Sequence, residues 1–148
     1  MKTFVPILER ILSTLWIGGL WVVGFVVAPT LFRTLPDTSL AGTVVGSLFT
    51  SMNRIGLLCG SALLILAWLQ RASAERRWQL LIIGLMLVLI IAGEFVLAPM
   101  IAELRVSGQV ATERFARLHG LAGALYGINC LLGLGLVATR RELHSRSG

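Results

Sequence analysis

Apolar residues are gathered in four long runs that are separated by short polar segments. The runs extend from Ile11 to Phe32, from Ile55 to Leu69, from Trp78 to Ile101 and from Leu118 to Thr139. A helix needs about 20 residues to cross the roughly 30 Å of a bilayer's hydrocarbon core. The pattern therefore predicts four spanning helices, at about residues 8–32, 53–70, 78–101 and 116–139, within one membrane domain that covers residues 1–148.

The second run is short, and the segment before it has its own helical period. Leu40, Val44, Leu48 and Met52 recur every four residues, whereas Thr43, Ser47, Thr50 and Ser51 occupy much of the other side. This spacing predicts an amphipathic helix that leads into the second span, with Asp37 or Thr38 as its N-cap. A helix that binds a partner is the alternative.

Composition agrees with the pattern. Hydrophobic residues make up 56% of the 148 residues, charged residues make up 14%, and the mean hydropathy is +0.86. Soluble domains contain only about 45–50% apolar residues. The first run is also longer than the roughly 7–15 apolar residues of a signal peptide. We therefore expect an all-α integral membrane protein, a bundle of four permanent spans whose main partner is the lipid bilayer.

The distribution of basic residues predicts the orientation. With the amino terminus inside, eight of the 13 Lys and Arg residues lie on the inner side: Lys2, Arg10, Arg71, Arg76, Arg77, Arg140, Arg141 and Arg146. The outer side holds Arg33, Arg54, Arg105, Arg114 and Arg117. The positive-inside rule then places both termini in the cytoplasm, most simply at a bacterial cytoplasmic membrane. The net charge of +6 is explained mostly by the basic residues that set this topology, so it does not indicate nucleic-acid binding.

A short internal repeat indicates a duplicated architecture. The sequence FVVAP at residues 25–29 returns as FVLAP at residues 95–99. Proline lacks an amide hydrogen and crowds the preceding turn, so we expect kinks or helix ends near Pro29 and Pro99. Aligning Phe49 with Phe115 extends the pattern to the other two spans, as a two-plus-two parallel repeat.

Glu94 is the clearest candidate for function. It lies inside the third span, roughly 10 Å from the outer end at about 1.5 Å per residue. An ionised side chain at that depth costs several kcal/mol, so it is expected to face the bundle interior and to find a partner. A hydrogen bond that repairs the kink at Pro99 is the structural alternative.

A second polar set lies in the fourth span. His119, Gly123 and Tyr126 share one helical face, with Asn129 on its flank, and Tyr126 lies at about the depth of Glu94. Together with Asn53 these residues predict an outward-facing polar pocket. Histidine can carry protons or bind metals, which makes His119 with Glu94 a candidate metal pair. Arg117 could bind an anion or be solvated.

Glycines mark the positions where helices approach closely. Gly56 and Gly60 form one GxxxG motif, Gly123 and Gly127 form another, and Gly120, Gly18 and Gly19 add to the set. Such motifs pack helices within a bundle or between the subunits of a homodimer or larger membrane complex. Both uses stay open.

Several function classes lack their motifs. The sequence contains no Walker loop, GxSxG, HExxH or dinucleotide fingerprint, which disfavours soluble-enzyme chemistry. Cys59 and Cys130 are typical of small apolar fillers. A haem bound by two histidines would need a dimer or a different axial ligand, because the second histidine, His144, lies in the inner tail.

The first and last spans resemble a known family. WIGGLWVVGFVVAPTLF at residues 16–32 and FARLHG at residues 115–120 are similar to the transmembrane protein 205-like family, also called domain of unknown function 4149. The resemblance covers about residues 8–138 and implies a small four-helix membrane protein with no assigned reaction. Its pattern positions here are Trp16, Gly18, Gly19, Pro29, Phe32, Phe115, His119 and Gly120.

Three hypotheses of function follow. The first is a protein that binds or moves a small ligand, proton or metal ion in the polar pocket, as a transporter does. The second is a membrane oxidoreductase subunit linked to haem or quinone, although no cofactor is required by the sequence. The third is a structural subunit that assembles a larger complex through its glycine faces.

Overall fold

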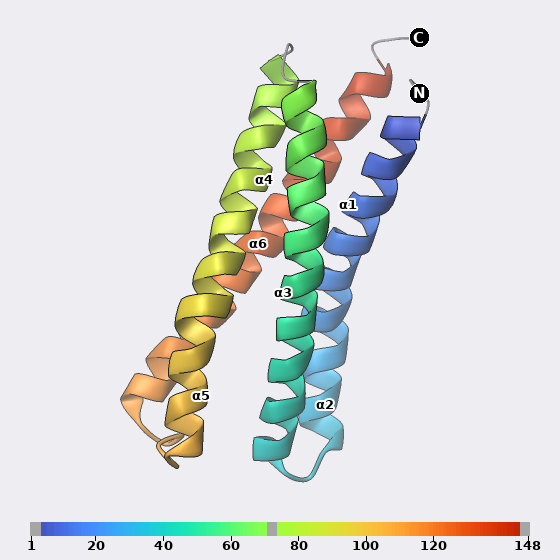
Figure 1. Cartoon of the computed structure of the whole chain (residues 1–148). Helices are drawn as coiled ribbons and strands as arrows, with labels where there is room; N and C mark the ends of the chain where they lie inside the picture. The colour runs from blue at the N-terminus through green and yellow to red at the C-terminus, as the bar shows by residue number, and fades with distance from the viewer. Residues whose placement is uncertain (1–3, 71–73, 146–148) are drawn as a thin grey trace.

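The computed structural model describes residues 4–70 and 74–145, and these residues form four long helical rods without a strand (Figure 1). The first rod consists of α1 (Phe4–Val22), the π-helical turn η1 (Val23–Val27) and α2 (Ala28–Thr34). The second is α3 (Thr38–Leu69). The third consists of α4 (Ala74–Ala92), η2 (Gly93–Leu97) and α5 (Ala98–Val106), and the fourth is α6 (Glu113–Ser145).

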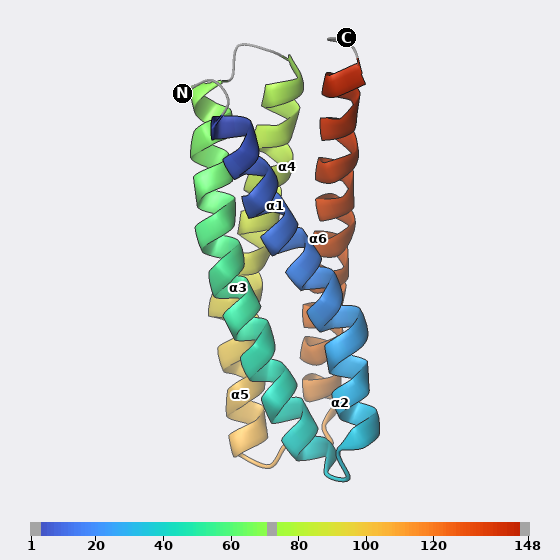
Figure 2. The same cartoon turned by 90° about the vertical axis from the view of Figure 1, so that its right-hand side faces the viewer.

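The rods alternate in direction and form a four-membered bundle. α3 packs between α1 and α4, α4 also packs on α6, and α6 closes the bundle against α1 (Figures 1 and 2). We call the end with the start of α1 and the end of α6 the terminal end. The opposite end, with the turns at residues 35–37 and 107–112, is the turn end. All four rods are long and apolar enough to cross a bilayer, so the chain is an integral membrane protein.

The amphipathic segment and the second span are one helix. α3 runs without interruption from Thr38 to Leu69, so the predicted start of the span near residue 53 lies within it. Asp37 is the N-cap, and its Oδ1 accepts a 2.8 Å hydrogen bond from the Ser39 amide. An acidic cap satisfies an amide that has no carbonyl partner within the helix, which confirms the predicted start.

Each Ala-Pro pair follows a π-helical turn. Neither rod ends at its proline, because α2 and α5 continue beyond Pro29 and Pro99. The amides of Ala28 and Ala98 bond carbonyls five residues earlier, those of Val23 and Gly93. In an α-helix the proline ring would collide with the carbonyl four residues before it. The wider π turn relieves this collision without breaking the rod.

The first and third rods match at an interval of 70 residues. Each has a 19-residue α-helix, a five-residue π turn and a short helix whose second residue is proline. The buried positions also recur: Glu9, Ser13, Trp16, Ile17 and Leu20 correspond to Gln79, Ile83, Met86, Leu87 and Ile90. The two halves therefore place the same positions against the core.

The second and fourth rods follow the same interval. Cys59, Gly60 and Leu63 are buried, as are Asn129, Cys130 and Gly133. An interval of 70 pairs Gly56 with Tyr126 and Asn53 with Gly123. The sequence alignment of Phe49 with Phe115 uses an interval of 66 and pairs Asn53 with His119. The pattern of buried residues favours the interval of 70, because the same interval relates the first rod to the third and the second rod to the fourth.

Trp16 fills the centre of the bundle. Its side chain is fully buried and lies along α3, where methyl groups added to Gly56 and Gly60 would come within 3 Å of the indole ring. Leu87 and Ile90 of α4 meet the same two glycines. The GxxxG motif of α3 thus packs within the chain, because only glycine leaves room for the ring.

The other glycines divide into two groups. Gly19 packs on Met52, where a methyl group would lie 2.5 Å from the Met52 Cε. Methyl groups added to Gly18, Gly120, Gly123 and Gly127 would meet nothing within 4 Å. Packing within the described residues therefore accounts for Gly19, Gly56 and Gly60, but not for Gly18 or for Gly120, Gly123 and Gly127 on α6.

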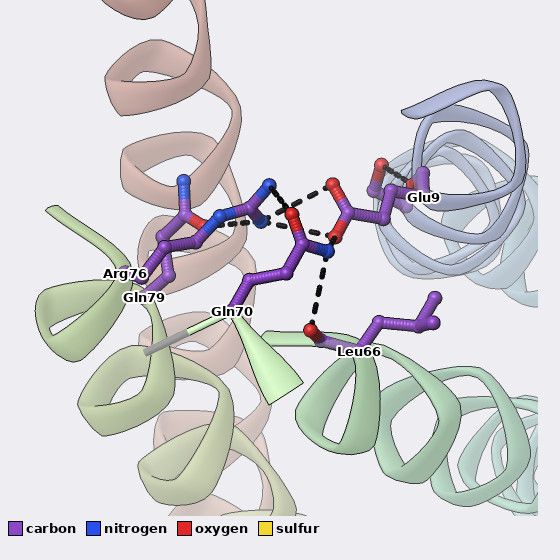
Figure 3. A network of polar contacts seen from close by, with 6 residues as sticks. Glu9, Leu66, Gln70, Arg76 and Gln79 are labelled. Carbon is purple, nitrogen blue, oxygen red and sulfur yellow. Dashed lines mark hydrogen bonds and ion pairs between the residues drawn. The ribbon is translucent and has the colours of Figure 1, made fainter. Parts of the chain in front are cut away.

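A polar network ties α1 to α3 and α4 at the terminal end (Figure 3). Arg76 Nη1 lies 3.0 and 3.2 Å from the two carboxylate oxygens of Glu9 and also donates to Gln79 Oε1. Gln70 accepts from Arg76 Nη2 and donates to Glu9 Oε1 at 3.3 Å. Glu9 and Gln79 are equivalent positions of the two halves, so Arg76 joins a pseudosymmetric pair.

We predict that Gly60→Ala lowers the free energy of unfolding by about 1–3 kcal/mol, the usual cost of overpacking a core. The added methyl group would lie 2.7 Å from Leu87 Cδ2 and 2.9 Å from Trp16 Cη2. Gly46→Ala is the matched control on the same helix, because it meets nothing within 4 Å. Unfolding in mild detergent, followed by tryptophan fluorescence, measures both. Equal stability of the two variants would contradict the packing described for Trp16.

Candidate functional site

Glu94 is held by a side chain from the neighbouring rod. It lies in η2, and its Oε2 accepts a 2.9 Å hydrogen bond from Asn53 Nδ2 of α3. Both residues are half-buried. The pair joins the second and third rods within the membrane-spanning part of the bundle, as the cost of burying a carboxyl group predicts.

No cation compensates this carboxyl group within the described part of the chain. The two ion pairs among those residues are Glu9 with Arg76 and Glu113 with Arg117, and Glu94 takes part in neither. The amide of Asn53 is neutral, so it orients the carboxyl group without neutralising it. The site is therefore suited to exchange a proton or to bind a small cation.

Tyr126 packs beside the π turn of the first rod, at Gly24, the position equivalent to Glu94. Its hydroxyl group donates a 2.6 Å hydrogen bond to the Leu20 carbonyl, one turn before Gly24. A methyl group at Gly24 would lie 2.5 Å from Tyr126 Cε1, so only glycine admits the ring. Phe49 of α3 packs against the same ring, with centroids 4.6 Å apart. Since Asn53 follows Phe49 by one turn, α3 links Tyr126 with the Glu94 pair.

The two halves differ in where they place a large and a small residue around Gly24 and Glu94. Gly24 and Glu94 are equivalent positions, and so are Tyr126 and Gly56. In one half glycine on the first rod receives tyrosine from the fourth. In the other half Glu94 on the third rod accepts a hydrogen bond from Asn53 on the second, about one turn from Gly56. The first half therefore has the aromatic ring of Tyr126 beside its π turn, whereas the second half has the carboxyl group of Glu94 in its π turn.

His119 lies nearer the turn end than the Glu94 pair. It is exposed, and its ring stacks on Phe115 with centroids 5.8 Å apart. It precedes Tyr126 by seven residues, so both project from one face of α6. The hydrogen bonds of the described residues do not join His119 to Glu94. Arg117, the candidate anion ligand, is an exposed side chain that pairs with Glu113 at 2.5 Å.

The remaining candidates are polar groups of the fourth rod. Asn129 is only 3% exposed, and its Oδ1 has no hydrogen-bond partner among the described residues. The described residues contain no cluster of three or more metal-binding side chains, so the pair of His119 and Glu94 stays a prediction. His144 belongs to α6, but its side chain lies outside the described part of the structure.

Packing between α3 and the third rod thins toward the turn end. Along one edge of α3, Gly60 meets Leu87 and Asn53 meets Glu94. Two turns farther on, Gly46 is exposed and meets nothing within 4 Å. Gly42 then meets only the guanidinium group of Arg105. Figure 1 shows α3 and α5 diverging over this stretch, so the Glu94 pair lies where close packing ends.

The family model for a domain of unknown function (DUF4149) matches residues 11–110, more than half of the chain. The chain belongs to the DUF4149 family. The match covers most of the first three rods, including Glu94, Asn53 and both π turns. It confirms the predicted DUF4149 membership, whereas FARLHG at residues 115–120 lies beyond the matched segment. Searches of curated proteins and of solved structures found no match.

Sequence reasoning missed several residues that shape this DUF4149 site. Gly24 was not among the site residues predicted from the sequence, yet it leaves the space that the Tyr126 ring occupies. Phe49 served only as an alignment marker, although it packs on the same ring. A signal for Gly24 was present, since the repeat has glycine where its other copy has glutamate. Phe49 gave no such signal, because aromatic residues are common on apolar faces.

We predict that Asn53 and Glu94 are energetically coupled. Asn53→Leu leaves the carboxyl group without its amide, whereas Asn53→Leu with Glu94→Leu removes both polar groups. A double-mutant cycle on unfolding should give about 0.5–2 kcal/mol, the range of hydrogen bonds between membrane helices. Thr43 and Arg105 form the control pair, because their 3.5 Å contact is exposed. Additive effects at Asn53 and Glu94 would refute the coupling.

Proposed function

We propose that this DUF4149 protein binds a small cation, a proton or a metal ion, at Glu94 and exchanges it with the aqueous phase at the turn end. The observation that carries the proposal is the carboxyl group of Glu94 inside a membrane span, bonded to a neutral amide and to no cation among the described residues. Ionisable residues at such depth are rare and typically mark pathways for ions or protons.

The backbone around Glu94 supports the proposal. Glu94 is the second residue of a π turn, and single π turns within α-helices are frequent at functional sites. The equivalent π turn in the first rod carries Gly24 and no ionisable group. Proline therefore explains the π turn in both rods. It does not explain the carboxyl group, which only the third rod carries.

Access from the turn end is supported by the position of the Glu94 pair, which lies where close packing between α3 and the third rod ends. Gly46 on α3 and His119 on α6 are both exposed beyond the Glu94 pair. At the terminal end, by contrast, Glu9 is buried in its network with Arg76 and Gln70. The ion would therefore reach Glu94 from the turn end, with His119 and Arg105 near the entrance.

The location and orientation are part of the proposal. The count of basic residues favours a cytoplasmic terminal end and an external turn end. Arg10, Arg76 and Arg77 lie at the terminal end of their helices. Lys2, Arg71 and Arg146 lie outside the described residues, and the side chains of Arg140 and Arg141 are not described. A bacterial cytoplasmic membrane with outside access to Glu94 fits this arrangement.

We predict that Glu94→Gln abolishes cation binding. A ligand present at a hundredfold excess over its Kd stabilises a protein by about 2.7 kcal/mol. Purified protein should show such a shift with at least one of Na⁺, K⁺, Mg²⁺ and Zn²⁺, or proteoliposomes should show proton flux with an entrapped dye. Glu103→Gln, an exposed carboxyl group at the turn end, should behave as wild type. Wild-type and Glu94→Gln protein that behave alike in both assays would refute the proposal.

A second prediction concerns access. In a background without Cys59 and Cys130, Glu94→Cys should react with a small cationic thiol reagent added from the turn-end side. Phe95→Cys is the matched control, because Phe95 is exposed on the outside of the bundle and should face lipid. Mass spectrometry of the labelled protein measures both. Labelling of Phe95→Cys but not of Glu94→Cys would contradict an aqueous path to the site.

A further inference from the structure

Four buried side-chain polar atoms have no hydrogen-bond partner among the described residues: Trp16 Nε1, Trp21 Nε1, Gln79 Nε2 and Asn129 Oδ1. Those of Trp16 and Asn129 are considered together because they lie at one level of the bundle. The Trp16 side chain is fully buried, and its Nε1 donor has no acceptor. Asn129 is 3% exposed, and its Oδ1 acceptor has no donor. A buried polar group without a partner costs about 1–3 kcal/mol, so a hydrogen bond to each of these atoms would stabilise the bundle.

The indole nitrogen of Trp16 points toward the turn end. The six-membered ring lies at Gly60, where a methyl group would come 2.9 Å from Cη2. The nitrogen lies one turn away at Gly56, where a methyl group would come 2.7 Å from Nε1 and 2.8 Å from Ile90 Cδ1. Asn53 is the next residue of this α3 face toward the turn end. The free N–H therefore lies one turn from the partner of Glu94.

Asn129 lies at the same level. On α6, Gly133 meets Met86 of α4, because a methyl group there would lie 3.5 Å from the Met86 Cε. The two helices are antiparallel, so one turn toward the turn end leads from Gly133 to Asn129 and from Met86 to Ile90. Ile90 also marks the level of the Trp16 nitrogen. Both unpartnered atoms thus belong to one layer.

Tyr126 completes this layer. Its hydroxyl group donates to the carbonyl of Leu20, the position equivalent to Ile90, and its oxygen can still accept a hydrogen bond. We define the polar layer as Trp16 Nε1, Tyr126 Oη and Asn129 Oδ1. The described residues contain no hydrogen bond between any two of these three atoms.

We propose that the polar layer is an internal water site. The indole N–H only donates, the Asn129 oxygen accepts, and the Tyr126 oxygen accepts while its proton is bonded to Leu20. Water both donates and accepts, and buried waters typically make two to four hydrogen bonds to groups of this kind. One or more water molecules would satisfy all three atoms, which no side chain of the layer does.

This water would extend the Glu94 site toward the middle of the bundle. Asn53 and Gly56 are one turn apart, and the Trp16 N–H lies at Gly56, so water bonded to that N–H would lie about one turn from the Glu94 pair. The inference rests on the unpartnered atoms and not on the proposed cation binding. A protein that binds no cation at Glu94 should still hold this water.

Water contact of the Trp16 indole tests the proposal. Full-length protein in lipid nanodiscs, with ¹⁵N-labelled tryptophan and the Trp16 signal assigned through Trp16→Phe, is measured by NMR for magnetisation transfer between water and the indole N–H. We expect a cross-peak in wild type, in Glu94→Gln and in Asn129→Ser, which keeps a polar group. Asn129→Leu, of similar volume but without an acceptor, should lose it.

Two results would overturn the inference: a resolved Trp16 signal without a water cross-peak in wild type, or an undiminished cross-peak in Asn129→Leu. If Asn129→Leu does not fold, Tyr126→Phe takes its place, because it removes only the hydroxyl group. The cross-peak should then be weakened, and an undiminished cross-peak would count against the water site. The Glu94 assays use a different residue and readout, so either proposal can fail alone.

Discussion

Backbone hydrogen bonding in hydrocarbon is the constraint on which this bundle depends. Water cannot satisfy a freed carbonyl inside a membrane, so a proline there needs local compensation. Both proline-containing rods widen into a π turn directly before the Ala-Pro pair. The widened turns keep each rod continuous while the helix path changes. They also place Gly24 and Glu94 toward the neighbouring rods, where each meets a polar side chain.

The two halves use these π turns differently. In the first half a tyrosine from α6 fills the space at Gly24 and donates to the backbone of the first rod. In the second half Glu94 lies in the π turn and accepts a hydrogen bond from the side-chain amide of Asn53 on α3. The first arrangement only completes the packing. The second introduces an ionisable group that the fold does not need, since the other half forms the same turn without one.

The sequence predicted the parts of the structure that follow from periodicity. Four apolar runs and the Asp37 cap are local properties, and each is present in the structure. At both prolines the sequence predicted a kink or a helix end, whereas the structure has a π turn and a continuous rod. Contacts between rods were harder to predict. Asn53 was expected near Glu94 only through a shared pocket, and the sequence alignment paired it with His119. The interval of 70 in the second and fourth rods becomes visible through burial, because glycine and tyrosine at equivalent positions share no sequence pattern.

Infrared difference spectroscopy of the protein in nanodiscs tests the central claim most directly, because it observes the carboxyl group of Glu94 itself. Changing the pH or adding a bound cation should change the carbonyl stretch of a protonated carboxylic acid. That change should vanish in Glu94→Gln, persist in Glu103→Gln and move in frequency in Asn53→Leu, which lacks the hydrogen-bond donor. A difference spectrum of Glu94→Gln identical to that of wild type would contradict the account, because Glu94 would then neither exchange a proton nor bind a cation.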